Sequence, residues 1–294
     1  MSRIFHYIIP KEFEGKTLLS FLKEERFSSP IITHLKRTER GILLNKEWGR
    51  VRDILHEHDL LTLTLTEGET SDNIVPVQLP LEIVYEDEDL MVVNKQAGMP
   101  IHPSQGNYDN TLANAVAYLY HMRKTPFVYR CINRLDRDTT GLLILAKNMY
   151  SASLLSDMVK NREIHREYLA VATGLVPEQG IIDQPIGRVA GSTIEREVNL
   201  EAGDIACTHF QRLAYENGYS LVSLQLETGR THQIRVHMKY IGHPLPGDFL
   251  YNPDYANIKR QALHSYRLSF SHPIDGTFLT FTAPLPDDMR CFFS

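Results

Sequence analysis

Apolar residues in the first part of the chain recur at two different spacings. Thr17 can cap a helix, and Ser29-Pro30 can open a second one that ends at Gly41. Leucine alternates with threonine from Leu60 to Thr66, which predicts a half-buried strand. The apolar positions that fall on one face of the two helices are Leu18, Phe21, Leu22, Ile31, Ile32 and Leu35.

Apolar segments after residue 80 predict both strands and helices. Two of them are joined by turn residues typical of hairpins, at Glu216-Asn217-Gly218 and at Pro273-Ile274-Asp275-Gly276. Hairpins favour antiparallel pairing, so we expect an α+β fold with a mixed, mainly antiparallel sheet. Further strands are predicted over 82–85, 90–94, 142–146, 168–172 and 278–282, and helices over 111–123 and 150–160.

Charge is distributed unevenly along the chain. The net charge is −5, yet residues 61–90 alone hold eight acidic residues and no Lys or Arg. This acidic, Pro-containing stretch reads as a linker and predicts two domains, 1–75 and 76–294. Because the acidity is local, the overall charge does not exclude a nucleic-acid partner.

Composition is that of an ordinary globular protein, with 294 residues, 43% hydrophobic and 23% charged. Cys131, Cys207 and Cys291 form no Cys-x-x-Cys pair, and the thirteen histidines show no ligand spacing, so we predict no disulfide framework and no metal site. No apolar run is long enough to span a bilayer. We expect a cytoplasmic protein without membrane contact, and a monomer.

One short segment concentrates charge beside an apolar run. Asp136 lies between Arg134 and Arg137, and Thr139-Thr140-Gly141 leads into a run of leucine and isoleucine. Nearby cations favour a charged carboxylate, which suits a nucleophile at a strand end. Taken alone, a loop aspartate in a surface ion pair is the more common explanation of the same residues.

Four ordered segments carry a resemblance to a known family. The first is Val93 to Pro103, the second Asn133 to Lys147, the third Arg166 to Gly174 and the fourth Glu227 to Asp248. In this order they resemble the motifs of the RluA-type RNA pseudouridine synthases, over roughly residues 80–290. Four motifs in order are more specific than any one of them.

The resemblance implies a fold and a set of site residues. It implies a pseudouridine synthase fold, with Asp136 as the catalytic aspartate, Tyr168 against the base and Arg235 as the counter-charge of Asp136. Arg230 competes with Arg235 for that role and otherwise binds substrate. Further substrate-binding residues implied by the motifs are Arg134 beside a flipped base, Leu263 flanking it, Lys95 as a phosphate contact, and Asn133, which stands where most members have His.

The N-terminal part resembles another module. Two short helices followed by Gly41-Ile42-Leu43-Leu44 and a strand are similar to the S4 RNA-binding domain, which predicts a small α/β domain that helps to orient RNA. Together these features predict an isomerase that converts uridine in ribosomal or transfer RNA to pseudouridine. That reaction needs no cofactor, because the base is detached, turned and rejoined.

Two other functions are consistent with parts of the sequence. A non-catalytic RNA-binding protein would keep the fold, although Asp136, Tyr168 and Arg235 are all present. A glycoside or nucleoside hydrolase would need a second acid, for which Asp138 is the candidate. Side chains two residues apart on a strand share a face, whereas those of a turn diverge, so this pairing is the weaker hypothesis.

Overall fold

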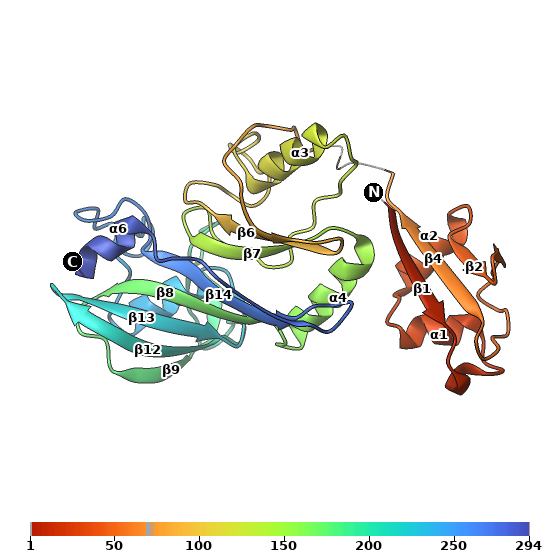
Figure 1. The fold of residues 1–294 in the computed structure, drawn as a ribbon. Coiled ribbons are helices and arrows are strands. Elements are labelled where there is room, and N and C mark those ends of the chain that lie inside the picture. The colour runs from red at the N-terminus through yellow and green to blue at the C-terminus, as the bar shows by residue number, and fades with distance from the viewer. Residues whose placement is uncertain (1, 69–70, 72, 294) are drawn as a thin grey trace.

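A computed structural model describes residues 2–68, 71 and 73–293, and these residues form two main sheets and a separate two-stranded one (Figure 1). The smaller sheet has the strand order β1-β4-β2-β3 and packs against α1 and α2. Its elements are β1 (Ser2–Ile8), η1 (Lys11–Phe13), α1 (Leu18–Glu24), α2 (Ser29–Arg37), β2 (Ile42–Leu44), β3 (Glu47–Trp48) and β4 (Leu60–Thr66). We call residues 2–66 the N-terminal domain.

The larger sheet forms the centre of the rest of the chain, in the order β5-β6-β7-β14-β8-β13-β12-β9 with β15 beside β14. Only β7 and β14 are parallel neighbours in it, so the predicted mixed, mainly antiparallel α+β fold is confirmed. Its strands are β5 (Glu82–Glu86), β6 (Leu90–Lys95), β7 (Thr140–Ala146), β8 (His165–Thr173), β9 (Gln179–Asp183), β12 (Cys207–Glu216), β13 (Tyr219–Leu226), β14 (Leu263–Ser271) and β15 (Phe278–Thr282).

Helices lie around this sheet (Figure 1), and β10 and β11 pair as a separate two-stranded sheet. Both predicted hairpin turns are present, joining β12 to β13 and β14 to β15. The remaining elements are α3 (Leu112–Met122), α4 (Met149–Lys160), β10 (Ile186–Arg188), β11 (Arg196–Val198), α5 (Gln233–Tyr240), α6 (Asp287–Arg290) and η2 (Cys291–Phe293). None of the helices in the described ranges combines the length and apolarity that crossing a membrane requires.

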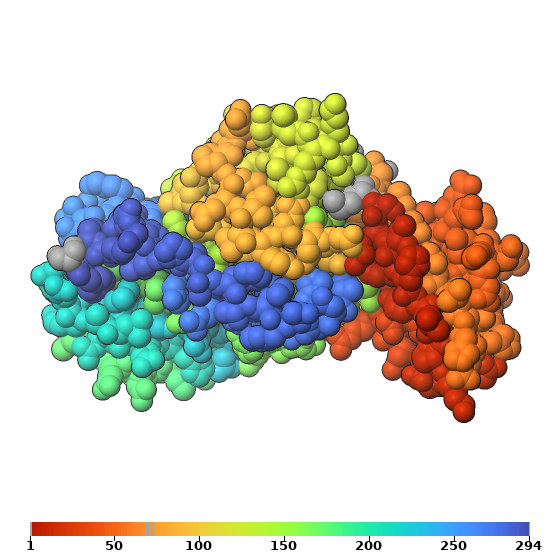
Figure 2. Space-filling model, viewed as in Figure 1, coloured from red at the N-terminus to blue at the C-terminus, as the bar shows by residue number. Residues whose placement is uncertain are grey.

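The N-terminal domain packs against α4 and appears as a distinct lobe beside the larger one (Figure 2). The Tyr150 ring stacks on Phe27 with centroids 4.1 Å apart, and its hydroxyl donates to the Glu25 carbonyl at 2.6 Å. Arg3 adds a bidentate pair with Asp89. Stacked aromatic rings and a partly buried ion pair hold the domain in a defined orientation.

Described residues at both ends of the segment between β4 and β5 form hydrogen bonds to the rest of the chain. Glu67 accepts from Arg130 and from the Met149 amide, and Val77 N donates to the Asn114 carbonyl. The predicted domain boundary near residue 75 falls within this segment and stays a prediction. Strand β1 was not predicted, because Phe5 is its one fully buried side chain and the pattern of apolar positions is therefore weak.

Candidate active site

Asp136 lies in a loop that is fixed where it enters β7. The Asn133 side chain accepts from the Ile144 amide at 2.9 Å, and Thr139 N donates to the Asp136 carbonyl at 3.1 Å. Gly141 has φ of +107°, and a Cβ there would collide with the Ser265 carbonyl of β14. Only glycine fits this approach, so the Thr-Thr-Gly turn places Asp136 at the end of a central strand.

Arg235 of α5 connects Asp136 to a second carboxylate. Its Nη1 donates to Asp136 Oδ2 at 2.8 Å, while Nε and Nη2 donate to both oxygens of Asp248 at 2.6 and 2.7 Å. The side chains of Arg235 and Asp248 are 1% and 0% exposed, whereas that of Asp136 is 29% exposed. The buried pair therefore holds the partly open carboxylate in one direction.

Charge balance keeps Arg235 ionised. Burial opposes its charge, but the hydrogen bonds to Asp248 and the charge of Asp136 leave the pKa of Arg235 above its ordinary value. Two carboxylates share one guanidinium, and Tyr251 adds its ring face 5.0 Å from the Arg235 Cζ atom. Asp248 was not singled out from the sequence, since thirteen positions separate it from its partner.

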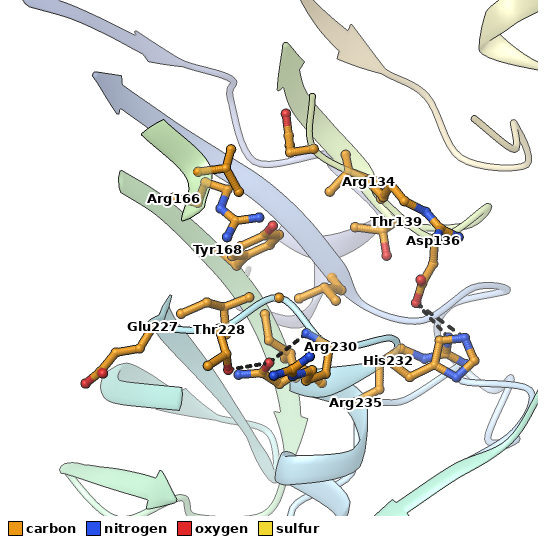
Figure 3. A pocket seen from close by; sticks show the side chains of 18 of the residues that line it. Arg134, Asp136, Thr139, Arg166, Tyr168, Glu227, Thr228, Arg230, His232 and Arg235 are labelled. Carbon is orange, nitrogen blue, oxygen red and sulfur yellow. Dashed lines mark hydrogen bonds and ion pairs between the residues drawn. The ribbon is translucent and has the colours of Figure 1, made fainter. Parts of the chain in front are cut away.

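A cavity of about 570 Å³ opens beside Asp136. Figure 3 shows Tyr168 and Arg166 on one side of it and Asp136 with Arg235 on the other. Tyr168 and Leu263 come from the neighbouring strands β8 and β14 and are both almost fully buried. An aromatic face, an apolar side chain and a carboxylate thus line one space that suits a flat base.

The two arginines of the fourth motif take different positions. Arg235 pairs with Asp136, whereas Arg230 is exposed and its Nε donates to the Ile205 carbonyl at 3.0 Å. Arg230 and the exposed Arg134 both lie at the cavity wall. The structure therefore brings together Asp136, Tyr168, Arg235, Arg134, Leu263, Arg230 and Asn133 at one cavity.

Lys95 lies elsewhere. Its buried ammonium donates to the carbonyls of Gln96, Met99 and Arg137 at 2.8, 2.9 and 2.8 Å. All three N–H donors are used, so the predicted phosphate contact does not fit Lys95. Through the Arg137 carbonyl it supports the loop that carries Asp136. From the sequence we expected an exposed Lys95 side chain, because a lysine is seldom buried unless its ammonium group has partners, and those partners could not be read from the sequence.

The arginine that follows Asp136 does not pair with it, although the sequence suggested that both flanking arginines stabilise its charged form. Arg137 binds Asp138, with Nη2 to Oδ2 at 2.8 Å, and not Asp136. Asp138 is not among the residues that line the cavity. A hydrolase that uses Asp136 and Asp138 as a carboxylate pair therefore lacks its geometry.

Two groups of side chains within the described ranges bring metal-ligating atoms within 4.8 Å of one another. In the first, Glu227 already accepts from His209 and from Arg162, at 2.6 and 2.8 Å. In the second, Arg3 already pairs with Asp89. The groups are Cys207, His209 and Glu227, and Asp87, Asp89 and His272. Each group joins two residues that lie two positions apart to a third from a distant segment, Glu227 in the first and His272 in the second, and that third member cannot be read from sequence spacing.

Comparisons with known proteins agree with this geometry. Residues 89–240 match the family described as RNA pseudouridylate synthase. The Bacillus subtilis RNA pseudouridine synthase YjbO is 40% identical over 274 residues, covering 93% of this chain and 96% of its own. Ribosomal large subunit pseudouridine synthase D of Zymomonas mobilis is 36% identical over 296 residues, covering 94% and 90%.

A solved structure shares the fold. The human RNA Pseudouridylate Synthase Domain Containing 1 aligns with a TM-score of 0.60 and 28% identity, over 70% of this chain and 83% of that one. The family match covers more than half of the chain, and it includes Asp136, Tyr168 and Arg235. The chain belongs to the RNA pseudouridine synthase family.

Proposed function

We propose that the protein converts uridine in ribosomal RNA of the large subunit to pseudouridine, with Asp136 as its catalytic residue. The observation that carries this proposal is the partly exposed Asp136 carboxylate, held by the buried Arg235 beside a cavity that takes a base. Relatives named as ribosomal large subunit pseudouridine synthase D support the choice of RNA.

The reaction needs a carboxylate at the ribose and a wall for the base. The N1–C1′ bond breaks, the uracil turns, and a C5–C1′ bond forms while the C5 hydrogen leaves as a proton and N1 gains one. Asp136 either attacks C1′ or takes a ribose proton, and both routes require its charged form. Tyr168 and Leu263 hold the detached base in place, because a base lost to water would stop the reaction halfway.

The cavity wall supplies the RNA contacts. The target uridine has to leave its stack, and the exposed Arg134 guanidinium is placed to fill or flank the vacated position. Arg166 also lines the cavity, where its guanidinium can contact a phosphate. The cations that line the cavity are Arg134, Lys160, Arg162, Arg166, Arg230 and Arg235.

Mapping of modified positions tests this function. Ribosomal and transfer RNA from cells that lack the protein are incubated with wild type or with Asp136→Asn, and carbodiimide-reactive pseudouridines are mapped. We expect new pseudouridine in large-subunit ribosomal RNA with wild type and none with the variant, which should retain the wild-type circular dichroism spectrum. Modification of transfer RNA alone would refute the proposal that ribosomal RNA is the substrate. Release of free uracil would indicate a hydrolase.

A further inference from the structure

His232 occupies an unusual backbone position at the edge of the catalytic cavity. Its φ is +59°, in the left-handed region, directly before α5 begins at Gln233. A non-glycine residue held there costs free energy, and such positions cluster at functional sites. The His232 side chain is 12% exposed and lines the cavity together with Asp136 (Figure 3).

A chain of hydrogen bonds fixes the tautomer of this ring. The backbone N–H of Arg196 in β11 donates to the Tyr251 hydroxyl at 2.9 Å, and that oxygen lies 3.0 Å from His232 Nδ1. Tyr251 is buried, and within the described residues His232 is the one acceptor for its hydroxyl proton. The hydroxyl therefore donates to Nδ1, and the proton of the neutral ring lies on Nε2.

The Nε2–H group faces the catalytic carboxylate without being bound to it. His232 Nε2 is 3.9 Å from Asp136 Oδ2, beyond hydrogen-bond distance, and Oδ2 already accepts from Arg235. No described residue accepts a hydrogen bond from His232 Nε2. A free donor thus points into the space beside Asp136 where the proposed substrate binds.

The ring is also kept neutral. Burial lowers the pKa of His232, and the cations Arg235 and Arg196 act in the same direction against the carboxylates Asp136 and Asp248. An imidazolium here would pair with Asp136 and weaken it as a nucleophile. A neutral donor leaves that carboxylate free.

We propose that His232 is a further catalytic group, which donates its Nε2–H to a carbonyl oxygen of the departing uracil, and that Tyr251 is the positioning residue that sets its tautomer. The inference rests on the proposed function. When the N1–C1′ bond breaks towards the base, its electron pair spreads onto the uracil oxygens. A preorganised neutral donor stabilises that charge and transfers no proton.

The tautomer is tested on the free protein, independently of activity. Long-range ¹H–¹⁵N spectra of the labelled full chain, with His232 assigned through His232→Gln, should show a neutral ring protonated at Nε2 at pH 7. Tyr251→Phe should give a mixture of tautomers or a protonated ring. A ring protonated at Nδ1 in wild type, or no change in Tyr251→Phe, would overturn the inference.

The catalytic role is tested by two substitutions at one position. His232→Ala should lower the single-turnover rate constant for pseudouridine formation by roughly a hundredfold. RNA affinity should stay within about twofold, because the cations of the cavity wall supply it. His232→Gln, whose amide nitrogen reaches the place of Nε2, should recover most of the loss.

The outcomes separate the two proposals. Wild-type activity matched by His232→Ala, or no recovery in His232→Gln, would refute the role of His232 alone. A wild-type protein that modifies no uridine would refute the proposed function, and the catalytic role of His232 with it.

Discussion

The catalytic cavity and the N-terminal domain use positive charge in opposite ways. Arg235 is buried and shared by two carboxylates. By contrast, Lys36 and Arg37 of α2 and Arg40 just after its end, which together we call the α2 basic face, are exposed and form no ion pair within the described residues. A paired, buried guanidinium fixes the direction of a reactive group. Free surface cations supply salt-dependent affinity for a polyanion. We therefore expect the buried guanidinium to act in the chemistry and the α2 basic face to add to RNA binding.

The largest effect is expected when the buried guanidinium is removed. Arg235→Met leaves the carboxylates of Asp136 and Asp248 without their partner, so the free energy of unfolding should fall by about 3–5 kcal/mol. Activity in a single-turnover assay should fall below detection. Arg230→Met, in the same motif, should cost less than about 1 kcal/mol in urea unfolding, because Arg230 is exposed. Equal losses in both variants would contradict the comparison.

The second prediction concerns the residue that holds Arg235. Asp248→Asn keeps the shape of the side chain but removes the charge that orients the guanidinium. We expect the single-turnover rate constant to fall roughly a hundredfold, a cost of about 3 kcal/mol for a charge-assisted contact, with RNA affinity unchanged. If affinity fell and the rate constant did not, Asp248 would act on binding and not on Asp136.

A third prediction concerns a buried histidine of β14 that follows Leu263, which lines the cavity. His264 of β14 contacts Thr140 Oγ1 and the Ala283 carbonyl, and burial lowers the pKa of His264 to about 4 from an ordinary value of 6.5. Between these values the unfolded chain binds the proton and the folded chain does not. Stability therefore rises with pH from 4 to 6.5, by up to about 3 kcal/mol.

Urea unfolding at pH 4.5 and pH 7 measures this contribution. His264→Gln should show a smaller gain between the two pH values than wild type, since it lacks the titrating ring. The same gain in both proteins would mean that His264 is charged in the folded state or does not contribute.

The smallest effect is expected at the α2 basic face. Replacing Lys36, Arg37 and Arg40 by glutamine should weaken RNA binding several-fold and lower the slope of log K against log salt by about 0.9 for each lost phosphate contact. Filter binding at several salt concentrations measures this slope. The single-turnover rate constant at saturating protein should not change. A slower rate with unchanged binding would place this face in the chemistry.

Much of the architecture could be predicted from local patterns. The alternation in Leu60–Thr66 and the turn residues around Gly218 and Gly276 predicted strands that the structure contains. These signals depend on neighbours in sequence, which a single chain displays directly. Strand β1 was not predicted from the sequence, because its partner β4 supplies most of the buried side chains of that pair.

The site was predictable only in part, for a physical reason. The four motifs indicated Asp136, Tyr168 and Arg235, which do meet at one cavity. The environment of each side chain depends on distant segments, so the burial of Lys95 and the clamp by Asp248 could not be read from spacing. The contact between Tyr251 and His232 could not be predicted either, because the direction of its hydrogen bond follows from the Arg196 backbone N–H of β11, which donates to the same hydroxyl.

Tritium release tests the central claim most directly. Forming the C5–C1′ bond displaces the hydrogen at C5, so large-subunit ribosomal RNA carrying [5-³H]uridine releases tritium to water only when pseudouridine forms. The account predicts release in proportion to the modified sites with wild type and none above background with Asp136→Asn of equal thermal stability. Release by Asp136→Asn at the wild-type rate would contradict it.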